Sequence, residues 1–380
     1  MGHVPLPRSP TPGAVPGSVP GSPPGTNPQE AGATAEERAQ ERRLRPSTLD
    51  EFAGQQAVVA NLVLAIQAAQ ERGEVLDHLL LSGLPGLGKT TLAHLVATTA
   101  QVTLHEASAP TLQRAADLAG LLTRLEEGDV LFIDEIHRVP IAVEEYLYAA
   151  MEDFVIDILI DQGPSARSVR IDLPRFTLVG ATTREGLLSA PLRTRFGIHE
   201  RLEPYEQDVL AHILARSAGI LRVGLDADAA MYLAGRSRGT PRVANRFLRR
   251  VRDLAQLEAD NHITCAVAEE GLSRIGVDQH GLTRVDRQIL AAIGRAGGRP
   301  MGLKSIAAAV GEDERTLEDV YEPHLLRAGL ILKTSQGRHL TETAWQMLGL
   351  RTDGGDPSPS DPAPSDPAAS GSDNEPSLFT

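Results

Sequence analysis

The segment 79–91 contains residues whose types and spacing suit phosphate chemistry. Gly83 is separated by four residues from the triplet Gly88, Lys89 and Thr90. Small residues let successive backbone N–H groups surround a phosphate, a lysine neutralises the β- and γ-phosphate oxygens, and a threonine hydroxyl binds Mg²⁺. An apolar run precedes the glycines and a helical pattern follows Thr91, so strand, loop and helix are predicted. The pattern is a P-loop, and it predicts ATP and Mg²⁺ as cofactors.

A second segment supplies the acids that an ATPase needs. Residues 129–135 read Asp-Val-Leu-Phe-Ile-Asp-Glu, which predicts a buried parallel strand that ends in two carboxylates. Asp134 would hold the metal through its water shell, and Glu135 would accept a proton from the water that attacks the γ-phosphate. The alternative is a pair of exposed, idle acids, which a P-loop upstream disfavours. We therefore interpret this segment as a Walker B strand.

Polar side chains also follow the next predicted strand, residues 176–183. Thr182 and Thr183 stand at its end, where they can contact the γ-phosphate or the attacking water; alternatively, they cap the next helix. Arg193 and Arg195 follow on a short turn. An arginine supplied across a subunit boundary stabilises the charge of a transferring phosphoryl group.

The elements between these motifs must bring them together. Alternating strands and helices predict a parallel sheet with its ligand at the carboxyl ends of the strands. The segment 45–55, ahead of a predicted helix near residues 58–66, is expected to lie over the adenine. Two β-rich runs around Gly163 and Pro164 predict an inserted hairpin, either an interaction surface or an ordinary extension of the sheet.

Composition sets the limits of the folded part. Residues 1–34 are rich in proline and glycine, and residues 351–380 in Asp, Pro, Ser and Ala, so neither end is expected to form a core. The sequence shows no secretory signal and no apolar run long enough for a membrane span. Cys265 is the single cysteine, which fits a reducing compartment. These observations predict a cytoplasmic protein. The formal net charge is −13, but local patches decide contact with nucleic acid.

The part of the chain after the predicted sheet changes character twice. Residues 206–276 are predicted to be helical, with Arg242 just inside a helix that starts at Pro241, from where it can reach nucleotide. Further arginines follow at positions 246, 249, 250 and 252, and they fit a DNA patch and helix-surface salt bridges equally well.

From residue 282 onward, three short helices and two strands about a glycine turn predict a winged helix. Its third helix is acidic, which argues against ordinary major-groove reading, whereas the wing carries Lys333 and Arg338, which suit phosphate contact without sequence choice.

Taken together, these motifs resemble the RuvB family, the AAA+ motors of Holliday junction branch migration in bacteria. The resemblance runs from about Arg45 to Leu350 and is most specific in six stretches: residues 84–91, 131–138, 163–168, 180–184, 238–242 and 318–323. It implies a large α/β AAA+ ATPase domain with a parallel sheet (35–205), a small all-α lid domain (206–276) and a winged-helix head (279–350), between disordered termini (1–34 and 351–380).

The resemblance also implies roles for individual residues. Lys89 and Thr90 would bind phosphate and magnesium, Asp134 and Glu135 would form the Walker B pair, and Thr183, Arg195 and Arg242 would act as γ-phosphate sensor, arginine finger and second sensor. Other nucleotide contacts would come from Leu44, Arg45, Gly86, Gly88, Thr91, Glu152, Asp153, Phe154 and Tyr205.

The resemblance also implies partners. The chain would form a homo-hexameric ring on double-stranded DNA at Holliday junctions, would bind RuvA through the hairpin near Gly163, and would work with the resolvase RuvC and without a membrane.

The chain departs from the family pattern at Leu84, where the family usually has proline, and in the wing at Lys333 and Gln336, where it usually has arginines. A switch-type AAA+ replication initiator, a protein-remodelling AAA+ ATPase and a winged-helix regulator with structural ATP are the alternatives. The hairpin and the acidic third helix favour the motor.

Overall fold

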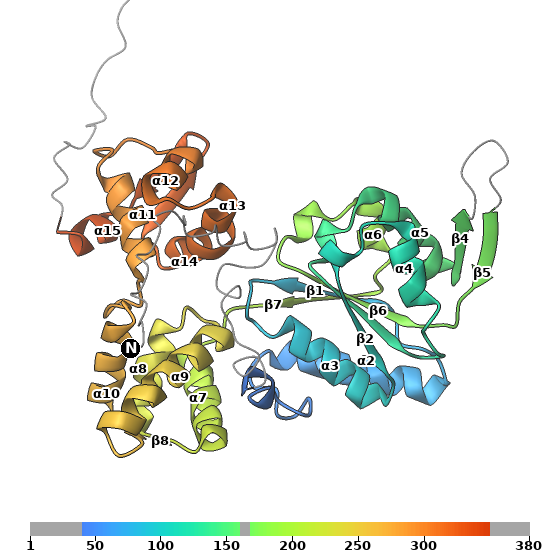
Figure 1. The fold of residues 1–380 in the computed structure, drawn as a ribbon, viewed down its shortest axis with the longest axis horizontal. Coiled ribbons are helices and arrows are strands. Elements are labelled where there is room, and N and C mark those ends of the chain that lie inside the picture. The colour runs from blue at the N-terminus through green and yellow to red at the C-terminus, as the bar shows by residue number, and fades with distance from the viewer. Residues whose placement is uncertain (1–39, 160–167, 350–380) are drawn as a thin grey trace, which may run out of the picture. The chain divides into compact units, whose positions relative to one another are not determined.

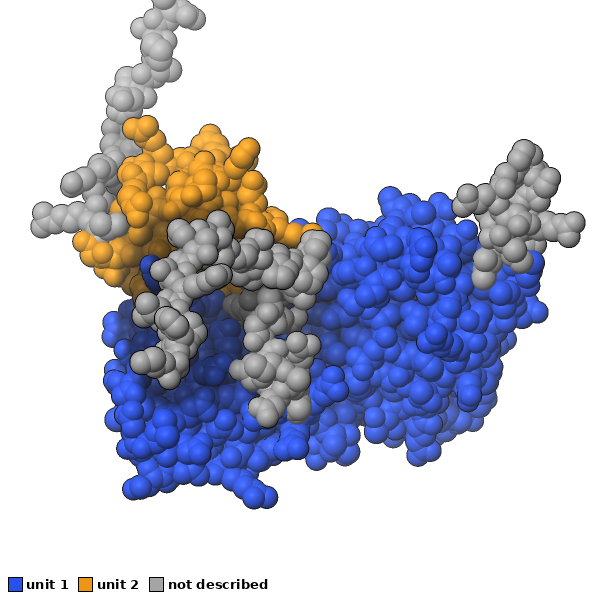
Figure 2. All heavy atoms as spheres, viewed as in Figure 1, with its two compact units in different colours: residues 1–284 blue, residues 285–380 orange. Residues whose placement is uncertain are grey.

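The computed structural model describes residues 40–159 and 168–349, and the chain falls into two compact units that meet in sequence at Arg284 and Val285 (Figures 1 and 2). The predicted tails and the turn around Gly163 and Pro164 lie outside the described residues. In the part of the chain that is described, no helix is both long and apolar enough to cross a membrane.

The first unit is built on a five-stranded parallel sheet, which confirms the predicted α/β class. The strand order is β2 (Leu104–Ser108), β3 (Val130–Asp134), β6 (Thr177–Thr182), β1 (Leu79–Gly83) and β7 (Ile198–Leu202). The predicted P-loop, Walker B and threonine strands are therefore β1, β3 and β6, with β6 between the other two. Their carboxyl ends share one edge of the sheet, because all neighbours are parallel.

Helices cover both faces of this sheet (Figure 1). Leu79 and Leu81 of β1 join one buried cluster with α2 (Gln56–Arg72) and α3 (Lys89–Ala100), whereas Leu80 joins a second cluster with α4 (Ala115–Leu122) and α5 (Ile141–Glu152). Alternate residues of a strand point to opposite faces, so one apolar run serves both cores. Short helices complete this part: α6 (Ala190–Thr194), η1 (Ala109–Thr111), η2 (Ile136–Arg138) and η3 (Glu185–Leu187).

A helical subdomain follows within the same unit. It contains α7 (Gln207–Leu221), α8 (Ala227–Arg236), α9 (Pro241–Glu258) and α10 (Cys265–Arg274), with the short parallel pair β8 (Gly224–Leu225) and β9 (His262–Ile263). The apolar side chains Leu210, Leu214 and Phe247 join the same buried cluster as α2 and α3. The subdomain thus shares one continuous buried cluster with the helices that cover this face of the sheet.

The predicted hairpin is present as an antiparallel pair, β4 (Val155–Leu159) and β5 (Ser168–Asp172), which Figure 1 shows at the edge of the unit. It forms a two-stranded sheet of its own and is not an extension of the parallel sheet.

The second unit has the predicted winged-helix elements, with one difference. After α11 (Arg284–Gly294) and α12 (Leu303–Val310), the third helix is not regular: α13 (Glu314–Thr316) passes through a π-helical turn (Leu317–Tyr321) into α14 (Glu322–Arg327). Pro323 has no N–H to donate along the helix, which explains why the turn widens there. The wing strands β10 (Ile331–Thr334) and β11 (Gly337–Leu340) follow, and α15 (Glu342–Met347) closes the unit.

Candidate nucleotide-binding site

The loop between β1 and α3 has the backbone of a phosphate cradle. Gly86 and Gly88 have φ values of 81° and 107°, which glycine adopts without strain, and a Cβ on Gly88 would lie 3.0 Å from the ring of Phe52. Thr90 and Thr91 stand in the first turn of α3, where helix N–H groups attract anions. The loop therefore fits a phosphate chain, as the spacing predicted.

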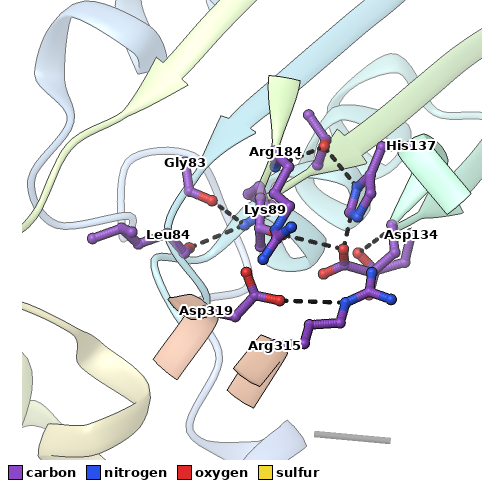
Figure 3. A network of polar contacts seen from close by, with 11 residues as sticks. Gly83, Leu84, Lys89, Asp134, His137, Arg184, Arg315 and Asp319 are labelled. Atoms are coloured by element: carbon purple, nitrogen blue, oxygen red, sulfur yellow. Dashed lines mark hydrogen bonds and ion pairs between the residues drawn. The ribbon is translucent and has the colours of Figure 1, made fainter. Parts of the chain in front are cut away.

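Lys89 is folded back onto this loop. Its Nζ donates to the carbonyl oxygens of Gly83 (2.8 Å) and Leu84 (3.0 Å), as Figure 3 shows. Burial lowers the pKa of Lys89 to about 8, while the negative charges of Asp134 and Glu135 act in the opposite direction. An ammonium group held by two neutral carbonyls can exchange them for phosphate oxygens, which are stronger, charged acceptors.

The Walker B carboxylates stand at the end of β3, on the same sheet edge. Asp134 Oδ1 accepts the N–H of Glu135 (3.0 Å), and its second oxygen is available to a cation or its waters. Glu135 has a φ of 53°, a left-handed conformation that is uncommon for a non-glycine residue and is often found at functional sites.

Thr183 and His137 surround Glu135. The Thr183 hydroxyl donates to Glu135 Oε2 (3.2 Å). Nδ1 of His137, which is labelled in Figure 3, lies 3.4 Å from the same oxygen and 2.9 Å from Thr182 Oγ1. Burial, and secondly the charge of Asp134, raises the pKa of Glu135. A carboxylate of raised pKa, aimed by hydroxyl and imidazole groups, is a suitable base for a water molecule.

The predicted adenine-side residues gather at the loop as well. Leu44 is buried, and its carbonyl accepts from Arg216 of α7 (3.0 Å). Tyr205 is buried and donates its hydroxyl to the carbonyl of Leu87 (3.1 Å), and a Cβ on Gly54 would meet the same ring. Arg216 of the helical subdomain thus binds the segment around residue 44, and Tyr205 binds the P-loop.

Arg242, predicted to reach nucleotide, starts α9 beside the cradle. Its N–H donates to the carbonyl of Gly86 (3.4 Å), its guanidinium lies 3.5 Å from Glu41, and a Cβ on Gly86 would come within 3.0 Å of its Cβ. The charge of Arg242 is also one cause of the lowered pKa of Arg45, after burial and the opposing effect of Glu41. Arg45 and Arg242 together make the mouth of the site cationic.

Arg195 belongs to a second group of predicted residues. Its Nη2 donates to Glu152 Oε2 (2.7 Å) and its Nη1 to the carbonyl of Pro191 (2.9 Å), contacts that lie on α5 and α6. Asp153 caps α5, and Phe154 has a φ of 51° and packs edge-on to Phe176. The structure therefore divides the predicted site into a P-loop group and a group around Arg195.

The predicted DNA contacts of the wing are paired with the acidic third helix. Glu322 Oε2 accepts from Arg338 Nε (3.0 Å) and Nη2 (2.7 Å), and its Oε1 lies 2.9 Å from Lys333 Nζ. The Arg338 side chain is only 11% exposed, against 46% for Lys333. Lys333 is therefore the more accessible of the two cations.

Sequence reasoning missed several of the residues that hold this site. Phe52, His137, Tyr148 and Glu322 received no individual roles, although His137 stands two residues after the Walker B glutamate and Tyr148 one helical turn before Glu152. Spacing alone was the available signal, and it does not say which neighbours will meet.

The chain has a P-loop and a Walker B strand at one edge of a parallel sheet, followed by a helical lid. These features define an AAA+ ATPase. A winged helix, a fold common in nucleic-acid-binding proteins, follows the lid. Comparison with known families gives three consecutive matches: "Holliday junction DNA helicase RuvB P-loop domain" (residues 44–202), "RuvB AAA lid domain" (205–278) and "RuvB C-terminal winged helix domain" (279–349).

Curated relatives agree over most of their length. The Holliday junction branch migration complex subunit RuvB of Myxococcus xanthus is 56% identical over 307 residues, which is 80% of this chain and 90% of the relative. The subunit of the same name from Flavobacterium johnsoniae is 53% identical over 319 residues, 84% and 94% of the two chains. The solved Thermotoga maritima RuvB Holliday junction branch migration motor has a TM-score of 0.75 and 47% identity, covering 81% of this chain and 99% of that one. The chain belongs to the RuvB family.

Proposed function

We propose that this AAA+ ATPase is the motor of Holliday junction branch migration, which couples ATP hydrolysis to movement of double-stranded DNA. The observation that carries this is the site around Lys89, Asp134 and Glu135 in a chain that matches all three RuvB domains in order. By the same resemblance, the protein works in the cytoplasm as a homo-hexameric ring with RuvA, which docks at the β4–β5 hairpin, and with RuvC.

Each side chain of the site has a distinct task in hydrolysis. Lys89 transfers its hydrogen bonds from the loop carbonyls to the β- and γ-phosphates, and Arg242 and Arg45 add positive charge at the mouth. Glu135, held by Thr183, orients the attacking water and takes its proton. The raised pKa of Glu135 strengthens it as a base.

The residues present also fit Mg²⁺. Thr90 in the first turn of α3 and Asp134 at the end of β3 offer a hydroxyl and a carboxylate, and magnesium prefers few protein ligands together with phosphates and waters. When bound, the ion would neutralise charge that develops on the phosphate oxygens.

Arg195 would complete the site of the neighbouring protomer. In the described chain its guanidinium contacts Glu152 and Pro191, whereas Lys89 contacts the carbonyls of the P-loop. We infer that this arginine at the end of α6, whose side chain is 28% exposed, acts in trans. Glu152, which contacts Arg195, and the adjacent Asp153 and Phe154 would lie at the same boundary between subunits.

Mixed rings test this shared site. Arg195→Ala and Glu135→Gln subunits are each expected to be inactive alone, but a mixture contains interfaces with an intact Walker site and an intact neighbouring arginine. ATPase activity should therefore reappear over a range of mixing ratios on DNA. If mass spectrometry shows that mixed rings form and activity stays at zero, the arginine acts in cis.

The experiment for the function as a whole measures ATP turnover and four-way junction dissociation, with and without the cognate RuvA. We expect duplex DNA and RuvA each to stimulate turnover and the combination to dissociate the junction. No stimulation by either would favour an initiator-type switch or a protein-remodelling ATPase.

A further inference from the structure

Residues of the helices α5 and α6 contact the Arg195 guanidinium. Tyr148 and Glu152 are one turn apart on α5 and so share a face, and Arg195 is the residue that ends α6. The guanidinium carbon lies 4.8 Å from the centroid of the Tyr148 ring, while its two terminal nitrogens bond Glu152 and the carbonyl of Pro191. Arg195 is thus held by one aromatic face and two hydrogen-bond acceptors.

Hydrogen bonds of the Tyr148 hydroxyl hold the orientation of the ring. Its hydroxyl donates to Glu144 Oε1 (2.7 Å) and lies 2.9 Å from Ser189 Oγ. Ser189 also donates to Glu144 and accepts the N–H of Leu192, which caps α6. Glu144 is only 6% exposed. This small polar network ties the start of α6 to α5, and the ring cannot turn away without breaking it.

The three contacts of Arg195 differ in what happens when a phosphate approaches. Glu152 is 62% exposed, and an ion pair at an exposed site is weak and easily exchanged. A triphosphate would compete with Glu152 for the same N–H donors. An aromatic face does not use those donors, so the contact with Tyr148 can persist while the nitrogens turn to a phosphate.

We propose that Tyr148 is a positioning residue for Arg195: its ring keeps the guanidinium at the subunit boundary while the hydrogen bonds pass from Glu152 to the γ-phosphate bound by the neighbouring protomer. This inference rests on the proposed trans role of Arg195. We therefore expect that a subunit without the Tyr148 ring supplies Arg195 poorly to the ATP site of its neighbour. The Walker site of the same subunit should remain intact.

Two substitutions separate the ring from the hydroxyl. Tyr148→Leu in the full-length chain should lower the DNA-stimulated kcat by about tenfold, comparable to the loss of a cation–π contact, and leave the KM for ATP unchanged. Tyr148→Phe keeps the ring and should lose no more than about twofold. Tyr146→Leu, on the same helix, is the matched control and should leave kcat at the wild-type value. A normal kcat for Tyr148→Leu, or a raised KM, would overturn the proposal.

Mixing shows which side of the interface is damaged. With Glu135→Gln subunits, Tyr148→Leu subunits should give more activity than either variant alone, because Glu135→Gln supplies an intact arginine to an intact Walker site. With Arg195→Ala subunits, no such gain is expected, because both partners are poor arginine donors. The opposite pattern would refute the proposal. The mixture of Arg195→Ala and Glu135→Gln subunits serves as the reference. If this mixture shows no ATPase activity, the proposed trans site itself is wrong. If it is active but the mixture of Tyr148→Leu and Glu135→Gln subunits is no more active than either variant alone, only the role of Tyr148 is rejected.

Discussion

Glu322, Arg338, Lys333 and Glu318 form a cluster of charged side chains in the winged-helix unit. Of these four, we expect Glu322 to contribute most to the stability of the unit. It is 6% exposed and accepts two hydrogen bonds from Arg338, whose side chain is 11% exposed, as well as contacting Lys333. Glu322→Gln removes the negative charge and leaves a buried guanidinium without a counter-ion. Removal of one member of a buried pair commonly costs about 3–5 kcal/mol.

The expected cost of Glu322→Gln lies at or just below the lower end of this range. Glutamine keeps one carbonyl oxygen as an acceptor, so we expect a loss of about 2–3 kcal/mol in the free energy of unfolding. For a domain of this size each kcal/mol lowers the melting temperature by roughly 4–8 °C, so a decrease of about 8–24 °C is predicted. Glu318→Gln is the matched control, because Glu318 is 40% exposed and contacts Lys333 at 3.4 Å. Its effect should stay below about 1 kcal/mol.

The sequence provides a local probe for this measurement. Trp345 on α15 is the single tryptophan, so its fluorescence follows the second unit and not the ATPase unit. Thermal unfolding of the full-length variants, monitored at this tryptophan, gives the midpoints. The double substitution of Glu322 and Arg338 to leucine should recover most of the lost stability, because no buried charge remains. If Glu322→Gln shifts the midpoint no further than Glu318→Gln, the pair is not the stabilising element described here.

Three further predictions concern ATP and DNA. Glu135→Gln should bind ATP with wild-type affinity by equilibrium titration but lose at least roughly a hundredfold in phosphate release, and near-normal turnover would remove Glu135 from its role. Because burial lowers the pKa of Lys89 to about 8, the ammonium form, which phosphate requires, is lost as the pH rises through that value. ATP affinity should therefore be constant below pH 8 and fall by about tenfold per pH unit above it, and a flat profile to pH 9.5 would contradict this. Removal of the charge of Lys333, the more exposed of the two wing cations, should weaken binding to all duplex sequences alike and reduce the log–log salt slope by up to about one unit, with basal ATPase retained. A sequence-dependent loss, or an unchanged slope, would place the DNA grip elsewhere.

The chemistry of the ATP site was predictable because it is encoded in contiguous residues. The P-loop spacing from Gly83 to Thr90 and the two acids after an apolar strand each describe a local backbone path, and the structure has both where expected. The strands β3 and β6 begin and end within one residue of the predicted segments 129–135 and 176–183, since uninterrupted apolar runs are typical of strands buried on both faces. The edge strands β2 and β7 were not predicted.

The irregular third helix shows where local reasoning was incomplete. Acidic residues and a helical pattern indicated a helix near residue 318, and a helix is there, but the π-helical turn before Pro323 was not expected. The acidity of this helix argues against base reading, but the sequence does not show that its Glu322 also neutralises the wing cations.

The sequence by itself determined the class of fold and predicted the nucleotide chemistry with the residues proposed to carry it, because these depend on hydrophobic periodicity and on short motifs. Only the tertiary structure decided the partners of the long charged side chains: Arg195 with Tyr148 and Glu152, and Arg338 with Glu322. These contacts join residues 16 to 47 positions apart along the chain, from Glu322 to Arg338 and from Tyr148 to Arg195. They depend on how helices and strands pack in three dimensions, which no pattern of nearby residues specifies.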